Sequence, residues 1–249
     1  MFKKILKTGL LLLLVVFLIF VLLYSVQKMK QIKYASLKIE IPENTPRYLD
    51  ESGVRKVVMS YVPSLMSMSI DSVDLGALEQ RLESVAAIKN AEVYHKILID
   101  DFQLSAQLVV HVYQREPIVR VLSGGRDYYM DAEGVSIGER GAYARKVILI
   151  TGKVDEEYLR KELLPLIEFI RCDEFWRAQI KDIYVDANGE LTMLPLVGDE
   201  TVLFGSPERY EEKFRNLKAL YEQGFSKFGW NKYKTIDLRY RGQVVCGKK

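Results

Sequence analysis

A literal match to a catalytic motif is the run Gly134-Val135-Ser136-Ile137-Gly138, which fits the G-x-S-x-G pattern of hydrolase nucleophile elbows. Such an elbow needs a strand before the serine, a helix after it, and an acidic residue and then a histidine later in the chain. Residues 139–143 show no helical periodicity, and both histidines, His95 and His111, precede Ser136. A hairpin turn followed by a strand explains the same residues, so we expect Ser136 to be structural.

The other reactive residues lack the partners that their chemistry needs. Ser25-Val26-Gln27-Lys28 fits S-x-x-K, but no Lys-Thr-Gly or Ser-Asp-Asn sequence accompanies it. Two histidines and two remote cysteines, Cys172 and Cys246, do not supply the three ligands of a usual zinc site. No G-x-G-x-x-G or Walker sequence occurs. We therefore expect no catalytic residue, no metal, no cofactor, no small-molecule substrate and no disulfide between the cysteines.

Ser136 falls in a region rich in short strands, residues 122–249, which we expect to form a mostly antiparallel β domain with two helices. Expected strands cover 128–130, 135–137, 146–150, 180–185, 190–194, 201–204 and 235–245, and Asn188-Gly189 is a strong hairpin signal. One helix is expected over 155–172 with a kink at Pro165. The other is expected to open at Ser206-Pro207, with serine as the cap.

The preceding region, residues 27–121, predicts a smaller unit in the order strand–helix–helix–strand–strand. Residues 37–41 alternate as a strand, and Asp50 and Asp74 are placed to cap two helices. Two further strands, 92–99 and 104–113, flank a turn at Asp100-Asp101. These elements predict a sheet with two helices on one face, so the fold class of the whole chain is α+β.

Residues 8–26 carry no charge and predict a single N-terminal transmembrane helix after a short tail, residues 1–7. Nineteen residues at ~1.5 Å each span about 28 Å, close to the ~30 Å of a bilayer core. A cleaved signal peptide is the alternative, but its apolar region is usually shorter and ends in small residues, whereas this run ends in Tyr24-Ser25. We expect the lipid bilayer to hold this segment.

Flanking lysines barely decide the orientation of the span. Three lysines precede it and three follow it closely: Lys3, Lys4, Lys7, Lys28, Lys30 and Lys33. The positive-inside rule is therefore nearly tied, and the amino terminus tips it slightly inward. The part of the chain that can fold lies after residue 27.

That part is almost neutral overall, with 33 acidic residues and, once the three lysines of the tail are left out of 36, 33 basic ones. A nucleic-acid-binding domain would need a strongly basic surface, so we expect no nucleic-acid partner. Positive charge gathers instead after residue 205, where five acidic residues accompany eleven basic ones: Arg209, Lys213, Arg215, Lys218, Lys227, Lys232, Lys234, Arg239, Arg241, Lys248 and Lys249.

Five stretches carry a resemblance to a known family. They are the span after a Lys-rich tail, Leu78-Glu79-x-x-Leu82 with the apolar residues that follow it, Val110-x-Val112-x-x-Arg115-Glu116-Pro117-Ile118, Tyr128-Tyr129-Met130-Asp131-x-x-Gly134 and Ile236-Asp237-Leu238-Arg239-Tyr240. In this order and spacing they resemble the FtsQ family, also called DivIB, of bacterial cell-division proteins.

The resemblance implies that the first unit is a POTRA domain and the second a β domain. It places both outside the cytoplasmic membrane, with the N-terminus in the cytoplasm and the protein enriched at the division septum. Relatives act as scaffolds of the divisome that help to organise septal wall synthesis, and their Arg-Tyr strand binds FtsB, which pairs with FtsL. By this resemblance we expect partners of the FtsB/FtsL type.

We expect the partner-binding residues on the last strand, 235–245, where a terminal strand forms a natural sheet edge. The residues themselves leave open whether Tyr240 is core or interface. The resemblance favours the interface, with Arg239 and Tyr240 as anchors and with Arg241, Gly242 and Val244 beside them.

An alternative function is that of a POTRA-bearing envelope transport or assembly factor. Such a protein would usually carry several POTRA copies or a C-terminal barrel of alternating strands. The sequence predicts one copy and no barrel. A non-enzymatic scaffold held in the membrane by one span is therefore the expected function.

Overall fold

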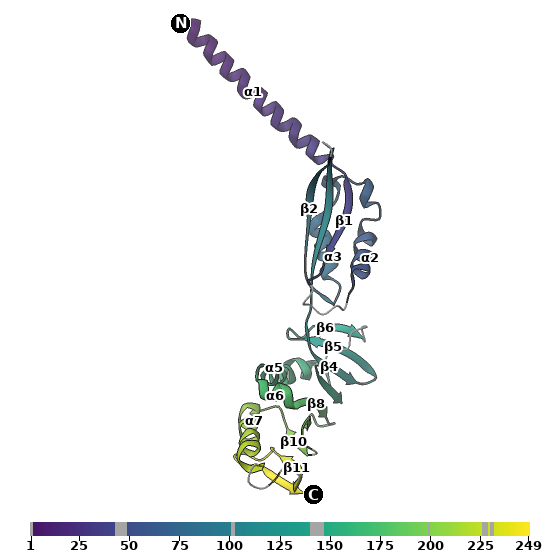
Figure 1. Ribbon diagram of the computed structural model, residues 1–249, viewed down its shortest axis with the longest axis vertical. Helices are drawn as coiled ribbons and strands as arrows, with labels where there is room; N and C mark the ends of the chain where they lie inside the picture. Colours follow the sequence, from purple (N-terminus) through teal and green to yellow (C-terminus); the bar gives the residue numbers. More distant parts are fainter. Residues whose placement is uncertain are drawn as a thin grey trace. The chain divides into compact units, whose positions relative to one another are not determined.

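The computed structural model describes residues 2–42, 49–100, 103–139, 147–198, 200–225, 229 and 232–249. The chain divides into two compact units, Met1–Gln114 and Arg115–Lys249 (Figure 1). The division falls at residue 114 and not at the expected 121, because strand β4, Pro117–Ser123, pairs with two strands of the second unit. The α+β fold class is confirmed.

The N-terminal helix α1 covers Phe2–Lys30 and includes the whole expected span. Its segment Gly9–Met29 has a mean hydropathy of 3.0, and none of it is buried inside the described protein. By length and composition this helix can cross a membrane.

The first unit has the expected order of elements: β1 (Tyr34–Glu40), α2 (Glu51–Tyr61), α3 (Leu75–Glu83), β2 (Ile88–Asp100) and β3 (Gln103–Gln114), with 3-10 turns at Leu65–Ser67 and Ile70–Ser72. The strands form one sheet in the order β1-β3-β2, in which β1 runs parallel to β3 and β2 antiparallel to it. The expected turn at Asp100-Asp101 falls partly on Asp101, which lies outside the described residues.

Both predicted helix caps of the first unit are confirmed. The carboxylate of Asp50 accepts a hydrogen bond from the N–H of Gly53, and that of Asp74 accepts one from Ala77. Each thereby satisfies an N–H group that the first helical turn leaves without a partner. The helices pack their apolar sides on the sheet in one core, to which α2 contributes Val54 and Val58, and α3 contributes Leu78 and Leu82.

The second unit contains a nine-stranded sheet in the order β12-β11-β10-β9-β8-β7-β4-β5-β6. Its remaining strands are β5 (Arg126–Asp131), β6 (Ser136–Glu139), β7 (Ile148–Gly152), β8 (Ile180–Val185), β9 (Leu191–Pro195), β10 (Thr201–Gly205), β11 (Tyr233–Asp237) and β12 (Val245–Lys248). Five of its pairings are antiparallel, as expected for most of the sheet; β4–β7, β7–β8 and β10–β11 are parallel. The strand expected over 146–150 begins at Ile148, and Lys146 lies outside the described residues.

The helix expected over 155–172 is present as three joined pieces: α4 (Glu156–Tyr158), a π-helical turn at Leu159–Leu163, and α5 (Leu164–Cys172). Pro165 stands in the first turn of α5, where its missing N–H group costs little, so the irregular turn before it takes the place of a simple kink. The carboxylate of Asp155 caps the start of α4.

Two features of the helices differ from expectation. A short helix that was not predicted, α6 (Glu174–Gln179), follows α5 and buries Trp176. Helix α7 covers Tyr210–Ala219 and a π-helical turn at Leu220–Gly224 continues it, so the cap predicted at Ser206 is wrong. The helix begins after Arg209, whose φ of 54° is left-handed, because the Ser206 carbonyl accepts a hydrogen bond from Lys213 and holds residues 206–209 in a turn.

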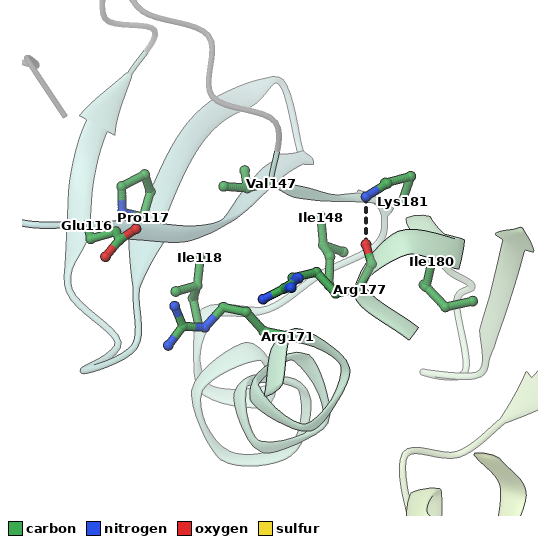
Figure 2. Close-up of a pocket in the computed structure, with 9 residues that line it drawn as sticks. All are labelled: Glu116, Pro117, Ile118, Val147, Ile148, Arg171, Arg177, Ile180 and Lys181. Carbon is green, nitrogen blue, oxygen red and sulfur yellow. Dashed lines mark hydrogen bonds between the residues drawn. The ribbon is translucent and has the colours of Figure 1, made fainter. Parts of the chain in front are cut away.

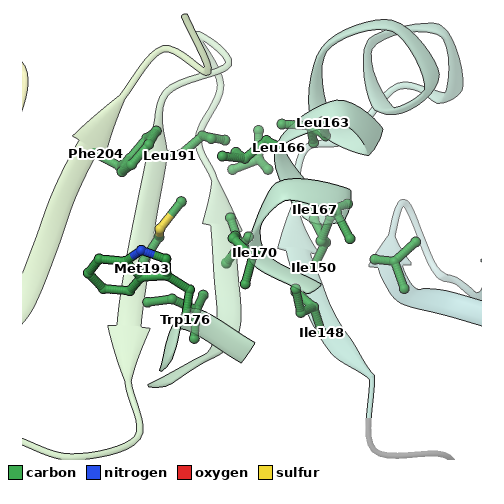
Figure 3. Close-up of a cluster of buried hydrophobic side chains, with 14 of the residues drawn as sticks. Ile148, Ile150, Leu163, Leu166, Ile167, Ile170, Trp176, Leu191, Met193 and Phe204 are labelled. Atoms are coloured by element: carbon green, nitrogen blue, oxygen red, sulfur yellow. The ribbon is translucent and has the colours of Figure 1, made fainter. Parts of the chain in front are cut away.

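The core of the second unit lies between the sheet and these helices. In Figure 3, Ile167 and Ile170 of α5 face Ile150 of β7 and Met193 of β9, and Trp176 packs beside them. Alternate strand residues point to the other face of the sheet, where Tyr184 and Leu194 are half exposed.

Candidate partner-binding site at the C-terminal hairpin

The segment 235–245, expected as one edge strand, is a hairpin instead. Strand β11 ends at Asp237, residues 238–244 form a loop, and β12 begins at Val245 and pairs antiparallel with β11. On its other side β11 pairs with β10, so the predicted edge is wrong: β11 lies inside the sheet. In the described part of the chain, strand β12 forms one edge of this sheet and β6 forms the other.

One hydrogen bond and one backbone conformation explain why the strand stops at Asp237. The carboxylate of Asp237 accepts a hydrogen bond from the backbone N–H of Arg239, a side-chain turn that competes with the strand ladder. Gly242 then adopts a φ of 72°, a left-handed conformation that glycine tolerates without strain, and the chain reverses. The alternation of apolar residues over 235–240 did not indicate either of these features.

Arg239 and Asp237 form a closely held ion pair. The guanidinium donates from Nε to Oδ1 at 2.9 Å and from Nη2 to Oδ2 at 2.6 Å, and its Nη1 lies 3.7 Å from Oε2 of Glu190. Asp237 is buried, whereas the Arg239 side chain is 44 % exposed. The hydrogen bonds from Arg239 lower the pKa of Asp237, and the Asp237 carboxylate raises that of Arg239. The pair therefore fixes the start of the loop.

The loop gathers the five expected site residues, but it does not present them equally. Tyr240 is 51 % exposed, and Arg241 and Gly242 are exposed beside it. Val244 is half-buried and packs against the core of the second unit. The exposed part of the predicted site is thus the turn from Tyr240 to Gly242, braced by Arg239 before it and by Val244 after it.

An edge-strand residue that the sequence did not single out adjoins this turn. Val245, the first residue of β12, is apolar and 45 % exposed. The turn signals of Asp237 and of Arg241-Gly242, read together with the apolar residues after them, would have pointed to a second strand here. An exposed tyrosine, an exposed valine and a sheet edge thus occupy neighbouring positions.

The geometry at Ser136 is that of a hairpin. Ser136 opens strand β6 directly after a turn in which the carboxylate of Asp131 accepts hydrogen bonds from the N–H groups of Glu133 and Val135. Glu139 continues the strand, and residues 140–143 lie outside the described residues. The turn-and-strand interpretation of residues 134–139 is confirmed, and it differs from the strand-to-helix turn of a nucleophile elbow.

Asp131 also anchors the start of the second unit. Arg115 donates from Nη1 to Asp131 at 2.7 Å and to Glu133 at 2.8 Å, and both Arg115 and Asp131 are largely buried. This pair ties the first residue of the unit to the β5–β6 turn. In the described part of the chain no group of three or more histidine, cysteine or acidic residues could hold a metal ion.

Comparison with known proteins gives one kind of match. A family model described as FtsQ/DivIB, C-terminal related, matches residues 116–247. These 132 residues are more than half of the 249 and include both the β5–β6 turn and the C-terminal hairpin. A search of curated proteins found no match.

Proposed function

Because the chain belongs to the FtsQ/DivIB family of bacterial cell-division proteins, we propose that it is a scaffold of the divisome that binds other division proteins outside the cytoplasmic membrane. The family is non-enzymatic, and the apolar helix α1 together with the family makes this a single-pass membrane protein. In this proposal the protein acts by position: it holds division proteins together and so helps to organise septal wall synthesis.

The observation that carries the proposal is the exposed edge at the C-terminal hairpin. An edge strand offers unpaired N–H and C=O groups to an added strand, and neighbouring side chains give that addition its specificity. Here β12 supplies the edge, and Tyr240 and Val245 supply exposed apolar surface next to it. Tyrosine and arginine are residue types enriched at the energetic centres of interfaces.

The charge around the hairpin favours an acidic partner segment. Lys234 and Lys248 are exposed on β11 and β12, and Arg241 is exposed in the loop between them. Complementary charge speeds the encounter of two proteins and selects among partners. We propose that the partner is of the FtsB/FtsL type and adds a strand to β12, with Tyr240 as the anchor and with Arg239, Arg241, Gly242 and Val244 shaping the loop.

The remaining parts serve localisation. We propose that residues 1–7 lie in the cytoplasm, that α1 crosses the membrane, and that the rest of the first unit, from β1 onward, and the whole second unit lie outside it, at the septum. The first unit has the strand–helix–helix–strand–strand order expected of a POTRA domain, and we propose that it is one and that it aids recruitment by other division proteins.

Imaging tests this function. A fluorescent fusion of the full chain, expressed in its own organism, is expected to form a ring at mid-cell in dividing cells. A fusion that carries only residues 1–33, which include helix α1 and end before β1, serves as the control and is expected to stain the envelope evenly. Even staining by the full chain would contradict a role in the divisome.

A further inference from the structure

A second candidate binding site lies away from the hairpin, at the amino-terminal ends of three parallel strands. Strands β4, β7 and β8 are neighbours and run in the same direction, so their first residues meet at one end of the sheet. There they line a pocket of about 260 Å³ (Figure 2). Strands β9, β10 and β11 separate β8 from the edge strand β12, so this pocket is distinct from the hairpin.

The floor of the pocket is apolar. Ile118 of β4, Ile148 of β7 and Ile180 of β8 line it and are buried, and Pro117 lies beside them. An apolar side chain that entered the pocket would be removed from water, which is worth about 25 cal/mol per Å² of buried apolar surface. The floor thus provides affinity for an aliphatic group.

Three cationic side chains surround this floor: Arg171 at the end of α5, Arg177 at the end of α6, and Lys181 at the start of β8. In Figure 2 the guanidinium groups of Arg171 and Arg177 extend into the same space, next to Ile118 and Ile148. Arg171 is half-buried and Arg177 is exposed, so water screens their mutual repulsion in part, and an anion between them would relieve what remains.

The N–H donors of these three cationic side chains are only partly engaged in hydrogen bonds. Glu168 holds Arg171 through two hydrogen bonds of 2.9 Å, to Nε and to Nη2, which leaves Nη1 free of that pairing. Lys181 donates to the backbone carbonyl of Arg177 at 2.6 Å. The guanidinium of Arg177 makes no ion pair or hydrogen bond with any residue that the structure describes.

The local charge balance remains positive. Among the described residues, two carboxylates stand near the three cations: Glu168, which pairs with Arg171, and Glu116, which lines the pocket and whose charge also acts on Arg171. Both arginines occupy the last turn of a helix, where a cation is favourable in any case. A helix end does not require both guanidinium groups to extend into one pocket, and the side-chain donors of Arg177 have no acceptor among the residues that the structure describes.

The volume restricts what can bind. With a water molecule taking ~30 Å³ of liquid, the pocket equals roughly nine waters, which is room for one or two side chains and not for a whole lipid. A carboxylate next to an aliphatic group matches the charged rim and the apolar floor together. Guanidinium groups hold carboxylates through paired N–H donors.

We propose that this pocket binds an acidic segment of a partner protein, with a carboxylate on Arg171 and Arg177 and the neighbouring aliphatic side chain on the isoleucine floor. This would be a second protein contact of the chain, and it does not depend on strand addition at β12. A negative result for this pocket therefore would not contradict strand addition at β12, and a negative result at β12 would not contradict binding in the pocket.

The probe for the test is a short peptide, acetyl-Gly-Glu-Leu-Gly-amide, and its partner in which glutamine replaces glutamate. The dye-labelled full chain, held in nanodiscs of neutral phosphatidylcholine, is titrated with each peptide and followed by thermophoresis. The glutamate peptide is expected to saturate the protein and to bind at least about tenfold more tightly than the glutamine peptide, because a charge-assisted hydrogen bond is lost. Absence of saturation in the millimolar range, or equal binding of the two peptides, would overturn the proposal.

Point variants test whether the peptide binds in this pocket. Arg177→Gln is expected to weaken binding of the glutamate peptide by about tenfold or more, and Arg177→Lys, which keeps the charge but not the planar fork, is expected to lie between the two. Arg215→Gln is the matched control: Arg215 is exposed on α7 and has no partner among the described residues. Thermal unfolding checks that each variant folds, and Lys181→Gln replaces Arg177→Gln if the latter does not.

Two results would reassign or remove the site. Unchanged affinity in a folded Arg177→Gln variant would show that the pocket does not hold the peptide. Displacement of the peptide by vesicles that contain anionic phosphatidylglycerol, but not by neutral vesicles, would overturn the peptide assignment in favour of a lipid headgroup.

Discussion

Tyr240 and Arg239 are neighbours in the chain, but their side chains have opposite relations to the rest of the second unit. Arg239 is bound to Asp237 and lies near Glu190, whereas Tyr240 is about half exposed. A side chain that is already held in place costs little further entropy when a partner binds, and an exposed ring provides surface for that partner to cover. Arg239 thus holds the start of the loop in place, whereas Tyr240 provides the surface that a partner can contact.

Tyr240→Ala is expected to weaken binding of the proposed FtsB-like partner by about 2–4 kcal/mol, the loss typical of an aromatic anchor at the centre of an interface. Calorimetric titration of the full chain with the extracytoplasmic segment of that partner measures the change. The matched control is Tyr94→Ala on β2, a tyrosine 46 % exposed in the first unit, which is expected to leave the affinity as it is. Equal affinities for wild type and Tyr240→Ala would contradict the assigned anchor.

Asp237→Asn is expected to destabilise the second unit by roughly 1–2 kcal/mol at neutral pH, because a neutral amide replaces the carboxylate that Arg239 holds. The partial exposure of Arg239 keeps the value low. The difference between wild type and variant, measured by thermal unfolding of the full chain in detergent, should depend on pH.

The direction of that dependence follows from the lowered pKa of Asp237 in the folded protein. A carboxyl group with a depressed folded pKa stabilises fully above its ordinary pKa, about 3.9, and loses that contribution as the pH falls through its folded value. The gap between wild type and Asp237→Asn should therefore close in acid. A gap that stayed constant down to low pH would show that Asp237 acts through packing and not through its charge.

Strand β12 is the element that decides whether a partner strand can add to the sheet next to the hairpin, because β6 forms the opposite edge. The N–H of Lys249 donates to the carbonyl of Lys232, toward β11. Because successive residues of a strand point their backbone groups to opposite sides, Val245 and Gly247 also face β11, and Cys246 and Lys248 direct their N–H groups to the open side. Cys246 is thus a position where the edge can be blocked without breaking the hairpin.

Cys246→Pro is expected to weaken strand addition by about 1–3 kcal/mol, because proline removes an outward N–H group and its ring obstructs an incoming strand. Proline is tolerated on edge strands where the N–H faces solvent, so the unfolding temperature should change little. Cys246→Ala is the control for loss of the thiol. Binding by the proline variant as tight as by the alanine variant would show that the partner does not add to β12.

At the scale of elements, the sequence predicted what local chemistry decides. Asp50 and Asp74 cap their helices as expected, because a cap depends on residues within one turn of it. Ser206 does not cap a helix, because a contact from Lys213 holds the chain in a turn there. The hairpin at the candidate site was missed for a related reason: the Asp237 carboxylate turns the chain, while the apolar alternation continued through Leu238 and Tyr240.

At the scale of the whole molecule, the sequence predicted the division into two modules more closely than the boundary between them. The two cores are separate clusters, and each follows the apolar periodicity of its own segments. The boundary was placed seven residues late because Pro117–Ser123 is a mostly apolar run that could form a strand in either unit. Its parallel partner β7 comes 25 residues further along the chain, and such distant pairing leaves no local mark in the sequence.

The lysines at and after the end of β12 have a consequence for how copies of this chain behave in the same membrane. If the β12 strands of two copies paired in a parallel alignment, Lys248 and Lys249 of one copy would stand beside those of the other. Repulsion between these ammonium groups would disfavour such pairing, even where the bilayer holds several copies close together. The same lysines attract a negatively charged strand. The edge of the sheet therefore favours pairing with an acidic partner over pairing with a second copy of this chain.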